Sequence, residues 1–125
     1  MSAGYSLQTA LVARLQGVSD LTGVYDGPPA RAAYPYLVAD CGAEQDWSAK
    51  DFVGREVAVA LTLWDDQPAR LQRVANVVEK TLDTELLVDG WTIASWRFLR
   101  RRTLRDVAGP WATAIDFRAR LLAQP

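Results

Sequence analysis

The chain has 125 residues, enough for one domain that buries about two thirds of the surface its unfolded form exposes. Half of the residues are hydrophobic and 23% are charged, which is the balance of a globular protein rather than a disordered one. There is no histidine and a single cysteine, Cys41, which excludes an internal disulfide, the commonest metal ligand and the usual general base. These absences weigh against most hydrolases and against thiolate metal sites.

Charge is divided unevenly along the chain. Residues 1–90 hold thirteen acids and seven bases, whereas residues 91–125 hold seven arginines and two acids. The net charge of −1 does not favour nucleic-acid binding. No apolar run approaches the roughly 20 residues that a membrane-spanning helix needs. We therefore expect the charge division to serve contacts between copies of this chain.

The first third of the chain predicts one helix and one short strand. Ser6 is the predicted N-cap of the helix, and Gly17 is the residue predicted to end it. Its apolar stripe consists of Leu7, Ala10, Leu11 and Leu15. Residues 17–33, rich in glycine and proline, predict a loop, and residues 34–40 predict a short strand. Residues 41–53 are polar and show no period, which predicts a second long loop.

The clearest unit of the sequence runs from Gly54 to Leu82. Residues 54–64 alternate with period two, which predicts a strand with one apolar face formed by Val57, Val59, Leu61 and Leu63. Residues 68–82 then change to helical spacing, with a stripe of Leu71, Val74, Ala75, Val78 and Leu82. Asp65 and Asp66 are predicted to supply N-cap oxygens to this helix. The helix should pack on the strand that precedes it.

The C-terminal part predicts strands only. Asp89-Gly90 between residues 86–88 and 91–93 favours a hairpin with a type I′ turn. A strand through residues 95–102 follows, with Trp96 and Phe98 expected in the core. Residues 111–121 alternate most regularly and predict the last strand. The whole chain is therefore expected to be a single α+β domain, with a mainly antiparallel sheet of about four to five strands and two helices packed on it.

Five arginines cluster in and after the strand over residues 95–102: Arg97, Arg100, Arg101, Arg102 and Arg105. In a regular strand Arg100 and Arg102 share one side, whereas Arg97, Arg101 and Arg105 share the other. Because this arrangement makes no continuous phosphate groove, a solvated or subunit-facing role is favoured over nucleic-acid recognition.

The predicted loop over residues 41–53 offers no catalytic or metal-binding pattern. Its acids and the preceding Asp40 lack the spacing of a calcium loop, which favours a solvated acidic loop over a metal site. Cys41 has no histidine partner and is expected to be a partly buried filler. Trp47 leaves two alternatives open, because it can anchor the loop on its own subunit or fill a pocket of a neighbour.

Several short motifs occur in a characteristic order along the chain. These are Val24-Tyr25-Asp26 with Pro29, Tyr34-Pro35-Tyr36, Asp46-Trp47-Ser48, Leu63-Trp64, the helix Ala69 to Leu82, Asp89-Gly90, the arginine-rich strand reaching Asp106, and Phe117-Arg118-Ala119. Together they resemble the tail terminator or tail-completion proteins of long-tailed phages and of the related gene transfer agents. The resemblance covers nearly the whole chain from Leu7 onward.

This resemblance implies a structural protein of the virion tail that is assembled in the host cytoplasm. It implies a hexameric ring that caps the tail tube, ends tube polymerisation and joins the tail to the head or neck. The implied partners are other copies of the chain, the major tail tube protein and the head–neck connector proteins, with DNA passing transiently through the lumen and no membrane contact. It implies no catalytic residues, no metal and no cofactor.

A ring uses head-to-tail contacts between two unlike patches, so an acidic region facing an arginine-rich region would suit it. We expect the loop over residues 42–53 and the arginine strand to form these contacts. The predicted interface residues are Asp46, Trp47, Asp51, Arg97, Arg100, Arg101, Arg102 and Arg105. Two alternatives are a monomeric protein-binding adaptor and another head–tail connector component. A small-molecule enzyme is disfavoured because no phosphate loop and no nucleophile–base pair is present.

Overall fold

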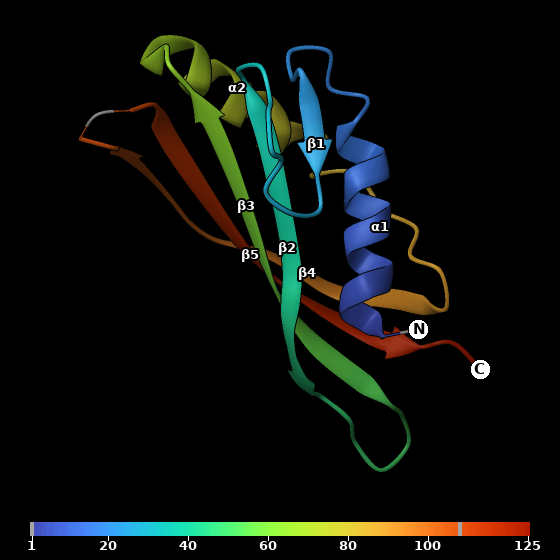
Figure 1. The fold of residues 1–125 in the computed structure, drawn as a ribbon. Coiled ribbons are helices and arrows are strands. Elements are labelled where there is room, and N and C mark those ends of the chain that lie inside the picture. The colour runs from blue at the N-terminus through green and yellow to red at the C-terminus, as the bar shows by residue number, and fades with distance from the viewer. Residues whose placement is uncertain (1, 108) are drawn as a thin grey trace.

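The computed structural model describes residues 2–107 and 109–125 (Figure 1). Its elements, in chain order, are α1 (Ala3–Leu15), β1 (Gly23–Tyr25), β2 (Tyr36–Asp46), β3 (Gly54–Asp65), α2 (Pro68–Thr81), β4 (Trp91–Arg105) and β5 (Trp111–Ala123). The five strands form one sheet in the order β1-β2-β3-β5-β4, antiparallel except for the β1–β2 pair. The predicted α+β class is confirmed. Neither described helix has the length and hydropathy needed to cross a bilayer.

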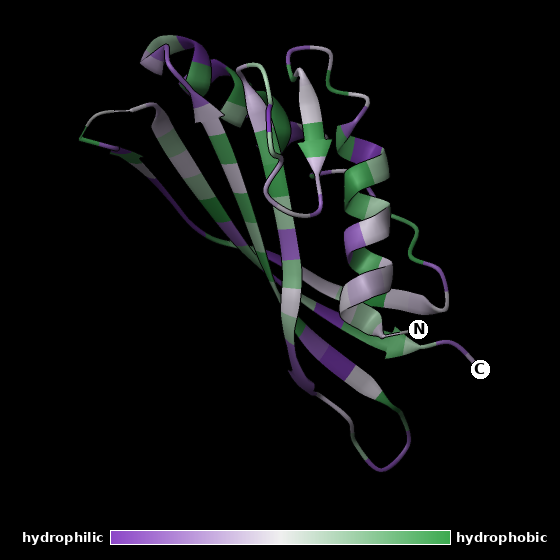
Figure 2. Cartoon of the chain, viewed as in Figure 1, coloured by the Kyte–Doolittle hydropathy of each residue, from purple (hydrophilic) through white to green (hydrophobic). Residues whose placement is uncertain are grey.

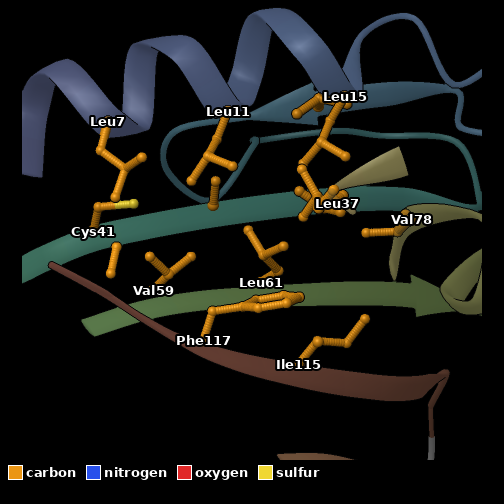
Figure 3. Close-up of a cluster of buried hydrophobic side chains, with 14 of the residues drawn as sticks. Leu7, Leu11, Leu15, Leu37, Cys41, Val59, Leu61, Val78, Ile115 and Phe117 are labelled. Carbon is orange, nitrogen blue, oxygen red and sulfur yellow. The ribbon is translucent and has the colours of Figure 1, made fainter. Parts of the chain in front are cut away.

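Both helices pack against the same face of the sheet, which we call the inner face (Figure 3). The alternation predicted for β3 and β5 is confirmed, since every second side chain of each strand lies in the core. These inward side chains are Val57, Val59, Leu61 and Leu63 of β3 and Ile115, Phe117, Ala119 and Leu121 of β5. The helices contribute the predicted stripes, including Leu7, Leu11, Leu71 and Val78. The opposite face, which we call the outer face, is covered by neither described helix and remains accessible.

The start of α1 and the segment after it differ from the prediction. The N-cap is Ser2, whose Oγ accepts the N–H of Tyr5 at 3.1 Å, so the predicted cap at Ser6 is wrong and Ser6 is buried within the helix. The predicted loop over residues 17–33 contains β1, which pairs in parallel with the start of β2. A three-residue strand is too short to show a period, and its parallel partner lies beyond a long connection.

β2 is longer than predicted, and the loop after it is shorter. The strand continues to Asp46, so the predicted loop over residues 41–53 is wrong for its first half. A bulge between Asp40 and Ala43 explains the difference, because one extra residue interrupts the period-two pattern that would reveal the strand. Beyond the bulge the inner face meets the start of α1, where the N–H of Gly4 donates to the Glu44 carboxylate at 2.7 Å.

The start of α2 is organised by an ion pair rather than by a side-chain cap. The N-cap is Gln67 and its side chain caps nothing, so the prediction of Asp65 and Asp66 as caps is wrong. Asp65 instead accepts the backbone N–H of Gln67 at 3.2 Å and two hydrogen bonds from the Arg70 guanidinium, at 2.7 and 2.6 Å. The Asp65 side chain is fully buried. This pair ties the first turn of α2 to the end of β3.

The hairpin predicted around Asp89-Gly90 is reduced to one isolated bridge between Val88 and Trp91. Among the described residues only Gly90 has a positive φ, 80°, whereas a type I′ turn needs two such residues, so that turn type is wrong. β4 is one continuous edge strand with two bulges. Trp96 packs on Phe117 with ring centroids 4.7 Å apart, but Phe98, also expected in the core, is 46% exposed.

Because α1 approaches β2 closely at Gly4, adding a methyl group there should destabilise the protein. An alanine Cβ there would lie 2.4 Å from the Cys41 carbonyl oxygen and 2.5 Å from the Glu44 carboxylate. Gly4→Ala should lower the free energy of unfolding by about 1–3 kcal/mol, although alanine normally favours a helix by about 1 kcal/mol. Urea unfolding checks this, with Gly27→Ala as control because nothing lies within 4 Å of its added Cβ. Equal stability of the two variants would contradict the close approach.

The Asp65–Arg70 pair predicts an acid-dependent stability. Burial opposes ionisation of Asp65, but the hydrogen bonds from Arg70 and Gln67 outweigh it, so the pKa of Asp65 is lowered. A lowered folded-state pKa contributes stability above the ordinary aspartate pKa of about 3.9, and this contribution is lost as the pH falls through the folded-state value. Asp65→Asn should therefore lower the free energy of unfolding by about 2 kcal/mol at pH 7, relative to the wild type. Thermal unfolding from pH 7 to pH 2 should show this difference shrinking, whereas a constant difference would contradict the assignment.

Candidate assembly surfaces

A bulge in β4 decides which arginines lie on the outer face. The extra residue is Leu99, because Phe98 pairs with Phe117 whereas Arg100 pairs with Asp116. As a result Arg97 lies on the same side as Arg100 and Arg102, not with Arg101 and Arg105 as the regular alternation predicts. The predicted side of Arg97 is therefore wrong. We call the three residues Arg97, Arg100 and Arg102 the outer arginine row.

The outer arginine row is only partly neutralised by its own chain. Arg100 donates through Nε to the Asp116 carboxylate at 2.9 Å. Arg97 stands opposite Arg118 of β5, a like-charge pair that is unfavourable unless an anion compensates it. Arg102 is exposed, and no carboxylate of the described residues forms an ion pair with it. The row therefore offers positive charge to a partner on the open face of the sheet.

Arg101 points to the inner face and holds α2 against β4. Its guanidinium donates to Glu79 and to Asn76, each at 2.7 Å, and to the backbone and side chain of Gln72. Gln72 in turn donates to Thr103 at 2.9 Å. This network lies within one chain, so Arg101 has a structural use that the sequence pattern did not reveal. Its predicted interface role stays a prediction.

Arg105 lies at the far end of β4, also on the inner side. Its guanidinium stands over the Trp111 ring at 5.5 Å from the ring centroid, a cation–π contact. The β4–β5 turn follows it and is drawn at the upper left of Figure 1. The turn lies at the end of the sheet opposite to the β2–β3 loop.

The shortened β2–β3 loop, residues 47–53, is folded onto its own chain. The Trp47 ring packs against Phe52 at 5.5 Å between centroids, and the Arg120 guanidinium stands over it at 5.2 Å. Trp47 therefore packs on its own subunit, and its predicted interface role stays a prediction. Asp46 accepts the Ser48 hydroxyl at 2.6 Å, and Asp51 is exposed.

The structure does not bring the predicted acidic and basic residues together within one chain. The β2–β3 loop adjoins Gly54, which pairs with Leu122, and Leu122 pairs with Thr92 near the start of β4. Arg102 and Arg105 lie near the other end of the same strand. Arg102 and Arg105 therefore lie at the opposite end of the sheet from the acidic loop, whereas Arg97 and Arg100 lie between the two ends. A contact between the acidic residues and the arginines stays a prediction for neighbouring copies.

Cys41 is buried on the inner face beneath α1 (Figure 3). Burial, and secondarily the charge of Asp40, raise the pKa of its thiol to about 12. At neutral pH the thiol is therefore protonated and a poor nucleophile. The expectation of a buried filler is confirmed.

Comparison with known proteins identifies the family. The family described as "Tail completion protein gp17" matches residues 8–122, and the chain belongs to it. This confirms the resemblance expected from the motifs and makes the chain a structural protein of a virion tail. No curated protein is significantly similar to this chain.

Two solved structures share the fold. A chain of "Virion of native gene transfer agent (GTA) particle" is 24% identical, with a TM-score of 0.85 and coverage of 98% of this chain and 100% of that chain. The bacteriophage SPP1 gp17 protein is 20% identical, with a TM-score of 0.64 and coverage of 98% and 91%. At these identities the likeness shows the fold alone.

The two neighbouring arginines of β4 predict different effects on stability. Arg101→Gln removes the network that holds α2, and should lower the free energy of unfolding by about 1.5 kcal/mol. Arg102→Gln removes an exposed side chain and should change it by less than about 0.5 kcal/mol. Urea unfolding of both variants is the measurement. Equal effects would mean that Arg101 and Arg102 do not lie on opposite faces of the sheet.

Proposed function

We propose that this chain forms a ring of identical subunits, a hexamer, that caps the tail tube and ends its polymerisation. The family match over residues 8–122 supports the tail context. The observation that carries the ring itself is the placement of unlike surfaces at opposite ends of one sheet. A symmetric dimer would join equal patches, whereas a head-to-tail contact joins unlike ones and closes into a ring when the rotation between neighbours allows it.

In this proposal the outer arginine row of one subunit meets acidic residues at the loop end of the next. Asp46 ends β2 at that end of the sheet, and Asp51 lies in the loop that Trp47 holds. Charge complementarity of this kind fixes register and suppresses wrong pairings more than it adds affinity. Arg97 and Arg118 stand opposite each other and repel, so an external anion bound at the row would relieve this repulsion.

The ring would contact the major tail tube protein on one side and the head–neck connector proteins on the other. DNA would pass through the lumen transiently, held by no base-specific contact, because tight sequence readout would stop its movement. The proposed role is structural and uses no cofactor. The high pKa of Cys41 supports a role without covalent catalysis, since this thiol stays protonated at neutral pH.

Charge reversal on the outer face tests the subunit contact. The double variant Arg97→Glu and Arg102→Glu should keep the monomer folded, because the new carboxylate at position 97 would face Arg118, and should weaken self-association at least ten-fold. Analytical ultracentrifugation compares it with the wild-type ring, expected at about six times 13.8 kDa. Arg73→Glu on the exposed side of α2 is the control. A double variant that assembles like the control counts against this interface.

The capping role is tested in the particle. Deletion of the gene should give tails of irregular length that do not join heads, and expression of the wild-type chain should restore them. Electron microscopy of the particles measures tail length and head attachment. Tails of normal length that are joined to heads without this protein would overturn the proposal.

A further inference from the structure

A cavity of about 520 Å³ lies between the segment that follows α2 and the first turn of β4. Its size is within the range of about 300–1,000 Å³ typical of binding pockets. The apolar part of its wall is formed by Leu82, Leu86, Leu87, Val88, Trp91, Ile93 and Trp96. Leu87 is 84% exposed, which leaves a large apolar side chain at the cavity without cover from its own chain. The cavity lies at the loop end of the sheet, because Thr92 and Gln124 also line it.

The walls of this cavity are held in place and carry negative charge. Arg14 of α1 donates to the Thr84 hydroxyl and to the Glu85 carbonyl, the latter at 2.8 Å, which fixes the segment after α2. On the other side the Gln124 amide donates to the Trp91 carbonyl at 3.2 Å. Asp83 and Glu85 are the two carboxylates among the lining residues, and no lysine or arginine of the described chain lines the cavity. The cavity is thus apolar with an acidic border.

The opposite end of β4 has the complementary character. Leu104 is 62% exposed and Val107 is fully exposed, so two apolar side chains stand in solvent at the β4–β5 turn. Arg102 and Arg105 flank them and are also accessible. We call Leu104, Arg105 and Val107 the turn knob. Exposed apolar groups with a charged border are typical of surfaces that bind a partner.

We propose that the turn knob of one subunit occupies the cavity of the next copy of this chain. The apolar side chains of the knob would cover Leu87, while Arg105 would face Asp83 and Glu85. This inference rests on the proposed ring, and it deepens that function by naming a second contact beside the outer arginine row.

The geometry requires a second copy. From Trp91 to Arg105 a strand spans about 45 Å, so a knob at one end of β4 cannot reach the cavity at the other end of the same chain. Figure 1 shows the β4–β5 turn and the start of β4 at far ends of the molecule. A copy that has used its knob still has a free cavity, and a copy that has used its cavity still has a free knob. Further copies can therefore be added until the chain of subunits closes into a head-to-tail ring.

Disulfide trapping tests the contact whether or not rings accumulate in solution. Protein carrying Val107→Cys is mixed with protein carrying Leu87→Cys, and oxidation should link them at least ten-fold faster than it links Val107→Cys with Tyr5→Cys. Tyr5 is the matched control, since it is 60% exposed on α1, away from the cavity. The native Cys41 is buried and unreactive in all three proteins. Equal rates of linkage would overturn the proposal.

A mixing experiment separates this contact from the proposed function. In protein that also carries Arg97→Glu and Arg102→Glu, which weaken the outer arginine contact, Val107→Asp and Leu87→Asp should each abolish the remaining self-association, yet an equimolar mixture should form a heterodimer of about twice 13.8 kDa, because one knob and one cavity remain intact. Native mass spectrometry measures the species. Self-association that persists in both variants in this background would refute the knob contact and leave the proposed ring standing. Selective linkage of residues 107 and 87 in a protein that cannot cap tails would instead refute only the capping function.

Discussion

The alternation of apolar side chains along β3 and β5 is the constraint on which the rest of the structure depends. These two central strands bury every second residue on one side, so both helices must lie there and the other side stays open (Figure 2). A charged side chain on β4 therefore either packs against a helix on the inner face or faces solvent on the outer face. On the inner side, Arg101 forms an ion pair with Glu79 of α2 and stabilises the fold. On the outer side, Arg97 and Arg102 remain available to a partner.

The bulge at Leu99 matters because it changes which residues share a face. Without it Arg97 would point inward, toward the core, and Arg100 and Arg102 would stand alone on the outer side. With it three arginines form a row on the open face. Bulges also twist an exposed edge strand and discourage unspecific pairing along it. In β4 the same irregularity therefore arranges the charged face and protects a 15-residue edge.

The strongly periodic parts of the fold could be predicted from the sequence, namely the two helix stripes, β3 and β5. Parts whose conformation depends on distant contacts could not. β1 exists only by pairing with β2, and the second half of β2 is hidden by its bulge. Of the candidate surfaces, the arginine cluster and the opposite sides of Arg101 and Arg102 were visible in the sequence, but the side of Arg97, which the bulge at Leu99 changes, was not. The cavity was missed because the segment over residues 82–88 has no period and is positioned by Arg14, about seventy residues away.

The division of β4 into two unlike ends links the fold to assembly. A sheet with helices on one side has two different faces, and the long β4–β5 hairpin adds two different ends. Such a body presents unlike patches at its two ends, which is what a head-to-tail contact between copies requires. Whether repetition gives a ring or a filament depends on the rotation between neighbours. Two separate contacts, at the outer arginine row and at the turn knob, would set that rotation more rigidly than one, because a second contact removes the freedom to pivot about the first.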